Sequence, residues 1–326
     1  MMKIVLTWVL AFSCSMGLAQ GPAGSYPNRP VRVLLTYPPG GASDTVVRIL
    51  SPGMSERLGK PVVVENRPGA NGVIAAEMVA KAPANGYTLL VAQTTAMGLN
   101  TVLFPNLPYD PQKELSPITL LVTSPFSISV NPSLMPVATI RDVIAMAKAK
   151  PGQLSYGSGG NLTGMHLAGE YFRILANVDL LHVPYKGNGP ALSDLAAGQI
   201  PIAFTDLGST AALAKSGRIK VLAISAKQRT PMAPEIPASE ETGLPGWYAY
   251  GSFGLIAPAG TPVEIINRLN AEVTALLRLA DVRERILATG NEPAPMSVEE
   301  YKAFINSETH KWVRVIKEAG IKLNDS

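Results

Sequence analysis

The chain has 326 residues, of which 47% are hydrophobic and 16% are charged, and its formal net charge is +4 at pH 7. This composition supplies a large apolar core, suggests about two domains and excludes a disordered, charge-rich chain. Basic residues are scattered along the chain without a run, so we expect no nucleic-acid partner.

The N-terminal segment has the pattern of an export signal. Lys3 gives a positive start, residues 4–12 are apolar, and small residues lead to Ala19. The apolar run is too short to span a bilayer. We therefore predict a signal peptide over residues 1–19 and a periplasmic mature protein. The only cysteine, Cys14, lies in this segment, so we expect a mature chain without disulfides or thiolate chemistry. Lipid attachment at Cys14 is the weaker alternative, because Phe12 is unusual in a lipid-attachment motif.

Short β-branched runs alternate with helical periodicity over most of the remaining chain. We expect strands at residues 31–36, 62–65, 88–92, 118–122, 127–130, 153–156, 181–183, 200–204, 221–225 and 253–257. Helices are expected at about 46–58, 74–81, 140–150, 166–175, 191–197 and 210–215. Such alternation predicts parallel sheets with helices on both faces. Three successive helices follow at 262–279, 282–288 and 298–319, the last with an apolar stripe that we interpret as a packing face.

Two short segments are places where one sheet could pass to a second sheet. They are residues 124–126 and 250–253. If the chain crosses at both, residues 27–124 and 253–326 form one lobe and residues 125–252 form the other. The predicted fold is therefore an α/β, two-lobed clamshell, or Venus flytrap, with two chain crossings and a cleft between the lobes.

The junction after the first strand is the most informative stretch. Its residues of interest are Tyr37, Pro39, Gly40, Gly41, Ser43 and Asp44. Prolines stop the strand, glycines free the backbone to turn, and Ser43 or Asp44 can cap the following helix. The unpaired N–H groups at a helix start attract anions. The turn is either an anion-binding site or an ordinary strand-to-helix connection.

Two further turns repeat this chemistry. The first contains Ser158, Gly159, Gly160, Asn161 and Thr163, and the second contains Thr205 and Asp206. Each closes an expected strand and opens an expected helix, with side-chain donors or caps beside free N–H groups. The structural alternative is simply a capped helix start. If two such helix termini face each other, they can hold one carboxylate between them.

Several motifs, in this order, resemble the Bug family, the solute-binding receptors of tripartite tricarboxylate transporters. They include Tyr37-Pro38-Pro39-Gly40-Gly41, Glu65-Asn66-Arg67-Pro68-Gly69, Asn85-Gly86-Tyr87-Thr88, His182-Val183-Pro184-Tyr185-Lys186-Gly187 and Ala257-Pro258-Ala259-Gly260-Thr261-Pro262. The resemblance covers essentially the whole mature chain. It implies a monomeric periplasmic binding protein that closes on a small organic carboxylate, held largely by backbone amides and waters at the loops matching residues 37–44 and 158–163. It also implies membrane transporter subunits as partners. We add Thr94, Thr95 and His166 to the expected ligand contacts.

The chain departs from the family pattern at one position. The family often has Asp directly after the Phe that matches Phe204, whereas Thr205 stands there in this chain and Asp206 follows. A carboxylate can receive an ammonium or an amide, while a threonine hydroxyl is neutral. We therefore expect Thr205 and Asp206 to govern recognition of the far end of the ligand.

Catalytic patterns are weak, and we predict that the protein is not an enzyme. His166, His182 and His310 lack metal-ligand spacing, so we expect no metal site. Ser158 has no G-x-S-x-G elbow around it, and the glycine-rich turns match neither a P-loop nor a dinucleotide fingerprint, so we expect no cofactor. Two functions remain open: a receptor that feeds a membrane transporter, or a ligand sensor that signals to a membrane sensor protein.

Overall fold

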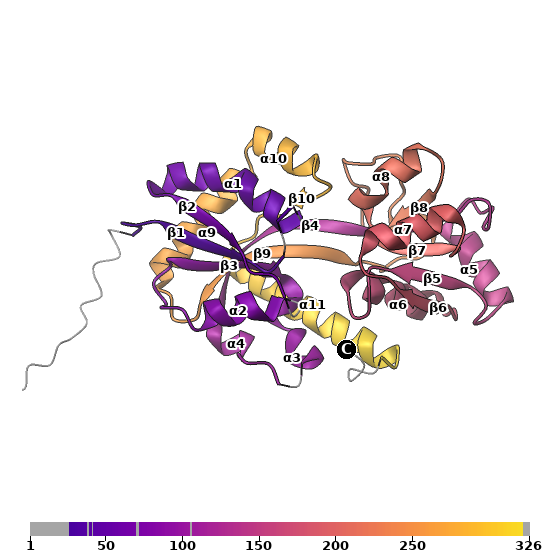
Figure 1. The fold of residues 1–326 in the computed structure, drawn as a ribbon, viewed down its shortest axis with the longest axis horizontal. Helices are drawn as coiled ribbons and strands as arrows, with labels where there is room; N and C mark the ends of the chain where they lie inside the picture. The colour runs from indigo at the N-terminus through magenta and orange to yellow at the C-terminus, as the bar shows by residue number, and fades with distance from the viewer. Residues whose placement is uncertain (1–25, 38, 41, 70–71, 105, 322–326) are drawn as a thin grey trace, which may run out of the picture.

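The structure, a computed structural model, describes residues 26–37, 39–40, 42–69, 72–104 and 106–321 (Figure 1). The predicted signal peptide, with Cys14, lies outside these residues, and so does Gly41 of the first turn. No helix within the described ranges is both long and apolar enough to cross a bilayer.

The strands form one continuous path that divides into two halves. The first half has the order β2 (Val62–Asn66), β1 (Val31–Leu35), β3 (Thr88–Gln93), β9 (Tyr250–Pro258) and β4 (Leu115–Val130), with β10 (Glu292–Pro293) also on β4. The second half continues from β4 to β7 (Ile202–Asp206), β5 (Ser155–Ser158) and β6 (Leu181–Pro184), with β8 (Lys220–Ile224) also on β4. Strand β4 is thus shared by both halves.

The structure corrects the sequence prediction in the middle of the sheets. Residues 118–122 and 127–130 do not form two strands but belong to the single strand β4. The prediction of parallel sheets is correct for β2–β1–β3 and for β6–β5–β7. It is wrong for the pairs between and beside them: β3 with β9, and β4 with β9, β7, β8 and β10, are antiparallel. The physical reason is the crossing itself: a chain that passes between two halves and then returns places its crossing strands in opposite directions.

Helices cover both faces of the sheets, as the alternating pattern predicted (Figure 1). The α-helices are α1 (Ala42–Leu58), α2 (Val73–Ala80), α3 (Asn100–Leu103), α4 (Pro111–Glu114), α5 (Ile140–Ala149), α6 (Gly164–Ala176), α7 (Asn188–Ala197), α8 (Leu207–Lys215), α9 (Val263–Leu277), α10 (Ala280–Leu287) and α11 (Val298–Glu318). Two 3₁₀ turns, η3 (Thr94–Met97) and η4 (Ser239–Thr242), complete the described elements. The parallel strands thus end at turns that lead into helices.

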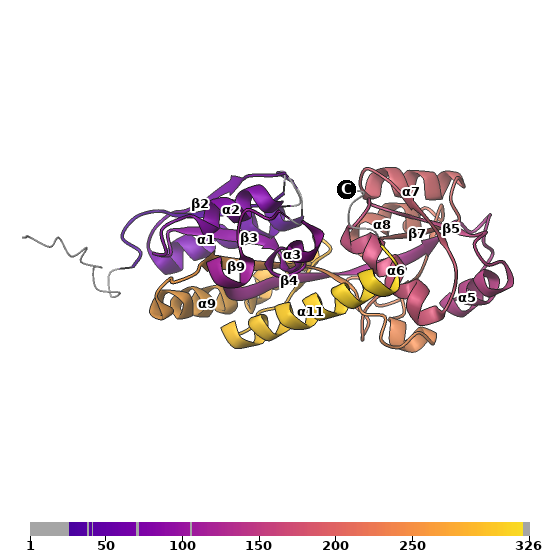
Figure 2. The same cartoon turned by 90° about the horizontal axis from the view of Figure 1, so that it is seen from below.

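The last helix belongs to both halves. Figure 2 shows α11 lying along the molecule beneath the two halves. Near its start, Tyr301 and Ile305 pack in a core cluster with residues of β1, β3 and β9. Near its end, Trp312 and Val315 pack in the core of the second half, and Trp312 makes an edge-to-face contact with Tyr171 of α6. The apolar stripe predicted for this helix is therefore a packing face that spans both cores.

Candidate functional site

A cavity of about 580 Å³ lies where the two halves meet. Its walls come from the turns after β1, β3 and β5, from the crossing segments of β4 and β9, from the start of α8 and from residues 289–291. The cavity therefore sits at the carboxyl ends of parallel strands on both sides, which is where open α/β sheets bind ligands.

The structure places some of the predicted site residues in the cavity lining and others outside it. Those that line the cavity are Tyr37, Gly40, Thr95, Gly159, Thr163 and Asp206. Predicted residues outside the lining are Pro39, Ser43, Asp44, Thr94, Ser158, Gly160, Asn161, His166 and Thr205. Ligand contact by any of these residues stays a prediction. Of the second group, Pro39 and Asn161 are exposed, whereas the others are buried or half-buried.

In the first turn, Asp44 holds the loop in place. Its carboxylate accepts hydrogen bonds from the Gly40 N–H at 3.0 Å, from Arg48 Nε at 3.0 Å and from Asn66 Nδ2 at 3.0 Å. Burial by itself would raise the pKa of Asp44, but these hydrogen bonds, led by that from Arg48, outweigh it and lower the pKa. Asp44 is therefore an ionised anchor within the protein, and the Gly40 N–H already has an acceptor.

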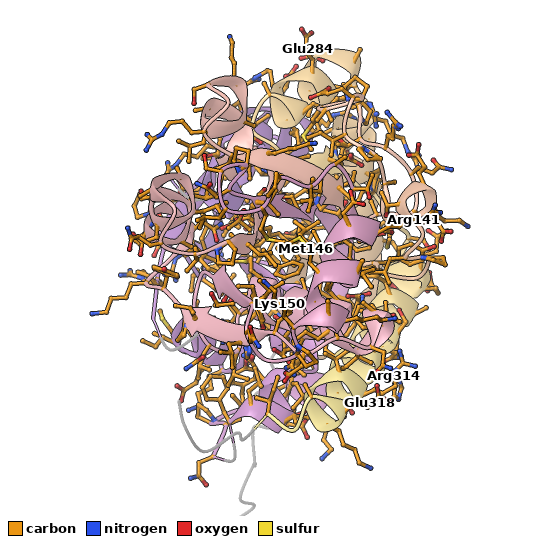
Figure 3. All side chains as sticks on the ribbon, turned by 90° about the vertical axis from the view of Figure 1, so that its right-hand side faces the viewer. Arg141, Met146, Lys150, Glu284, Arg314 and Glu318 are labelled. Carbon is orange, nitrogen blue, oxygen red and sulfur yellow. The ribbon has the colours of Figure 1, made fainter. Side chains whose placement is uncertain are left out.

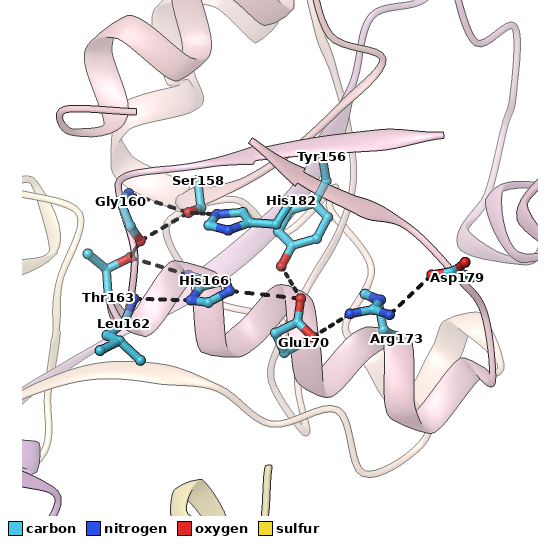
Figure 4. A network of polar contacts seen from close by, with 10 residues as sticks. All are labelled: Tyr156, Ser158, Gly160, Leu162, Thr163, His166, Glu170, Arg173, Asp179 and His182. Atoms are coloured by element: carbon cyan, nitrogen blue, oxygen red, sulfur yellow. Dashed lines mark hydrogen bonds and ion pairs between the residues drawn. The ribbon is translucent and has the colours of Figure 1, made fainter. Parts of the chain in front are cut away.

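The second turn is held by neutral groups (Figure 4). Thr163 is the N-cap of α6 and its hydroxyl accepts a hydrogen bond from the His166 N–H. His166 Nδ1 in turn accepts from the Leu162 N–H at 3.0 Å, and Leu162 has the left-handed backbone with φ 58°. A non-glycine residue in this region is strained and needs surrounding support. Here the strained residue is supported by the neutral acceptor His166 Nδ1, whereas the first turn is supported by the anionic Asp44.

A stack of aromatic rings lies beneath this turn. The rings of His166 and His182 stack at 3.9 Å, His182 also stacks on Tyr156 at 4.9 Å, and Ser158 Oγ lies 2.7 Å from His182 Nε2. Burial, followed by nearby positive charge, lowers the pKa of His166 to about 3 and the pKa of His182 to about 4. Both imidazoles are therefore neutral at neutral pH. Ser158 is fully buried, so its contact with His182 positions the loop.

The start of α6 is the most suitable place for an anion. The N–H groups of Leu162 and Thr163 have acceptors within the turn. The next two, those of Gly164 and Met165, belong to the first turn of α6 and have no acceptor within the helix. Both residues line the cavity. A carboxylate at this position gains hydrogen bonds and the favourable end of the helix dipole.

The described part of the cavity lining contains one charged side chain, that of Asp206, and no lysine, arginine or histidine. Asp206 ends β7 and accepts a hydrogen bond from the Asn188 side-chain amide. Loss of hydration raises the pKa of Asp206, and the Asn188 hydrogen bond only partly opposes this. Lys186, which follows β6, is exposed and lies outside the lining. Neutral donors therefore have to hold an anionic ligand.

Asn291 is a site residue that the sequence analysis missed. It is 1% exposed and lines the cavity, and its Nδ2 donates to Thr289 Oγ1 at 2.9 Å. Its Oδ1 has no partner among the described residues. Such a buried, unsatisfied oxygen is costly unless a ligand or water contacts it. The Gly290-Asn291 pair marks a turn, but no local signal shows that this turn faces the cavity, because β10 that follows it is held by its pairing with β4.

Two halves joined by crossing strands, with a polar cleft between helix starts, define a two-lobed periplasmic binding protein. A family model described as "Tripartite tricarboxylate transporter family receptor" matches residues 46–321. BugT of Bordetella pertussis is 32% identical over 324 residues, covering 99% of each chain. The chain belongs to this receptor family.

Solved structures agree with this assignment. A structure of an R. palustris protein with adipate is 33% identical, with a TM-score of 0.78, covering 90% of this chain and 98% of that one. MatC from Rhodopseudomonas palustris with bound malate is 31% identical, with a TM-score of 0.71, covering 89% and 100%. The periplasmic binding protein BugD is 30% identical, with a TM-score of 0.73, covering 91% and 99%. The predictions of the Bug family and of a two-lobed binding-protein fold are confirmed.

Proposed function

We propose that this protein is a periplasmic receptor that captures a small organic carboxylate in the cleft and delivers it to a membrane transporter of the tripartite tricarboxylate type. The observation that carries the proposal is the start of α6: Gly164 and Met165 line the cavity, their N–H groups have no acceptor within the helix, and the described lining has no cationic side chain. The relatives with adipate and with malate support the ligand class.

Binding follows from hydrogen-bond chemistry. A charge-assisted hydrogen bond to a carboxylate contributes roughly 1.5 to 3 kcal/mol, and the partial positive charge of a helix start adds to it. Thr95 lies in the lining and can donate its hydroxyl to the carboxylate, while the unpaired Asn291 Oδ1, an acceptor, can be satisfied by a water that bridges it to the ligand. The protein then acts by binding and release, without covalent chemistry.

We also propose that the cleft closes by movement of two lobes, residues 27–124 with 253–326 and residues 125–252. Two crossing strands leave the cleft as the weakest contact, which is the usual arrangement of a hinge. Because α11 packs in both cores, it has to bend or slide when the lobes move. Small-angle scattering with and without ligand should show compaction, and an unchanged radius of gyration at saturation would contradict the movement.

The direct test begins with the ligand that copurifies with the protein, identified by mass spectrometry after denaturation. Thermal shift and calorimetry then compare organic acids with their amides or methyl esters. A ligand at about 100 times its Kd should stabilise the fold by roughly 2.7 kcal/mol. Binding an ester as tightly as its acid would exclude carboxylate recognition.

A second test concerns delivery and export. Deleting the gene should abolish uptake of the identified ligand if the protein feeds a transporter. Retained uptake with loss of ligand-induced gene expression would indicate a sensor instead.

N-terminal sequencing of the exported protein should find Gln20 first if the signal peptide is cut after Ala19.

A further inference from the structure

The cavity has an apolar wall that a small polar acid would not use. Leu99, Leu103, Phe126, Leu162, Met165 and Leu167 all line it. They come from α3 and the residue before it, from β4 and from the turn and first residues of α6. Leu99, Leu103, Phe126 and Leu167 belong to one core cluster, and Leu162 and Met165 pack against that cluster. Leu162 and Met165 are half-buried and supply the part of this apolar wall that a ligand can touch, while the other four side chains are 1–3% exposed and form the packed layer behind them.

This apolar surface lies directly beside the proposed carboxylate position. A Cβ atom placed on Gly164 would come within 2.8 Å of the Phe126 ring, so the first N–H groups of α6 lie next to that ring. Met165 supplies both a free N–H and a flexible apolar side chain, which adapts to the shape of a neighbouring group. If a ligand binds its carboxylate at the start of α6, the rest of the ligand lies next to this apolar wall.

The charge distribution opposes a second carboxylate. Asp206 of β7 is paired directly with Phe126 of β4. It is the one charged side chain in the described lining. Tyr37 and Asp206 line the cavity from opposite halves, and burial, followed by the charge of Asp206, raises the pKa of Tyr37. A second carboxylate there would meet a like charge in a poorly hydrated space.

We infer that the ligand is a monocarboxylate with an apolar body, an aromatic ring or an unsubstituted aliphatic chain. Its carboxylate lies at the start of α6 and its body lies against the apolar surface. The inference rests on the proposed function and narrows it. Hydroxyl groups along the body would lose their hydration against carbon, and a site of this kind rejects them.

Calorimetry with matched six-carbon acids tests the inference. Hexanoate and gluconate share chain length and a single carboxylate, but gluconate carries hydroxyls along the chain. Adipate adds a second carboxylate to the hexanoate chain. We expect hexanoate, or 3-phenylpropionate as the aromatic probe, to bind at least about tenfold more tightly than gluconate and adipate. Equal or tighter binding of gluconate or adipate would overturn the inference, as would no binding of both apolar acids.

A pair of variants locates the apolar contact. Met165→Gln keeps the side-chain length and should weaken binding of the apolar acids about tenfold. Met146→Gln is the matched control. Met146 lies on α5 (Figure 3) and packs against the same core cluster. It is not among the residues that line the cavity. Equal effects of the two substitutions would overturn the inference, while the acid series on the unmodified protein tests it without any variant.

Binding of an uncharged analogue separates recognition of the carboxylate from recognition of the apolar body. Hexanamide is the uncharged counterpart of hexanoate. If hexanamide binds as tightly as hexanoate, carboxylate recognition fails while recognition of the apolar body stands. If gluconate or adipate binds best and its amide does not bind, the receptor function stands and the apolar body is wrong.

Discussion

The two turns that frame the cleft have similar sequences but are held by different physics. The first, residues 37–44, is anchored by the ionised Asp44 with Arg48 and Asn66. The second, residues 158–163, rests on the neutral, stacked rings of His166 and His182. The first anchor is half open to solvent through Arg48, whereas in the second His166 is buried and His182 is half-buried.

A glycine-rich turn can thus be held by an ionised carboxylate or by neutral, stacked rings. The two kinds of support should respond differently to pH. An ionised carboxylate behind the first turn keeps its loop in place over all of the physiological pH range. A buried imidazole stack can support the second turn only while both rings stay neutral. The two turns should therefore respond to pH and to mutation in different ways.

The largest expected effect is acid destabilisation through the second turn. The pKa values of His166 and His182 in the folded protein, about 3 and about 4, lie below the unfolded value of about 6.5. The unfolded state therefore takes up protons first, and stability present above pH 6.5 is lost as the pH falls. Glu170 and Arg173 face the stack, and Arg173 opposes protonation. Between pH 7 and 5, the loss should be about 2 kcal/mol for the buried His166 and about 1 kcal/mol for the half-buried His182, whose charge solvent partly screens, or about 3 kcal/mol for the pair.

Urea unfolding at pH 7, 6 and 5 measures this loss. The double variant His166→Gln with His182→Gln should show a shallower pH dependence than the parent. The lowered pKa of Asp44 contributes stability above the unfolded value of about 3.9, which is lost only at more acid pH. Asp44→Asn should therefore keep the parent slope between pH 7 and 5. Equal slopes for the parent and the double variant would break the comparison.

Removing one ring of the stack should have the next largest effect. His166→Ala leaves a cavity under the turn and removes the acceptor for the Leu162 N–H. We expect a loss of about 3 kcal/mol in the free energy of unfolding, with weaker ligand binding. His310→Ala is the control, because His310 is exposed on α11. Equal stability of the two variants in chemical denaturation would show that the stack does not support the turn.

Neutralising the first anchor should cost less. Asp44→Asn keeps the side-chain size but weakens the hydrogen bonds from Arg48 and the Gly40 N–H. The expected loss is about 2 kcal/mol in stability, with a lower ligand affinity. Asp142→Asn makes the same chemical change in the capping box of α5, outside the cavity lining, and should leave affinity unchanged. Calorimetry separates the two, and an unaltered affinity in Asp44→Asn would argue against this anchor.

The smallest expected effect concerns the backbone of the first turn. Gly40 has φ +83°, and no atom lies within 4 Å of a Cβ placed there. Gly40→Ala should therefore destabilise by about 1 kcal/mol through backbone strain alone. Gly189→Ala also meets open space but lies at the start of α7 without a positive φ, so it should be neutral or slightly stabilising. Thermal unfolding of the pair checks the sign, and a stable Gly40→Ala protein would contradict the strained turn.

Sequence reasoning predicted the turns well and their supports poorly. Prolines, glycines and caps are local signals, so the positions of the strand-to-helix turns at 37–44 and 158–163 could be located from the chain alone. Contact of Asp44 and His166 with the ligand stays a prediction, and the structure adds that both have partners inside the protein. Proximity in sequence does not tell whether a side chain faces the cavity or the loop that forms it.

The sequence by itself determined the alternation of strands and helices, the receptor family and the turns that carry free N–H groups, because these depend on neighbouring residues. Tertiary structure alone decided that residues 115–130 form one crossing strand, that α11 packs in both cores, and that Asn291 and the apolar wall face the cavity. These features join segments far apart in the chain. They are set by which apolar surfaces pack together, and that choice is made over the whole molecule.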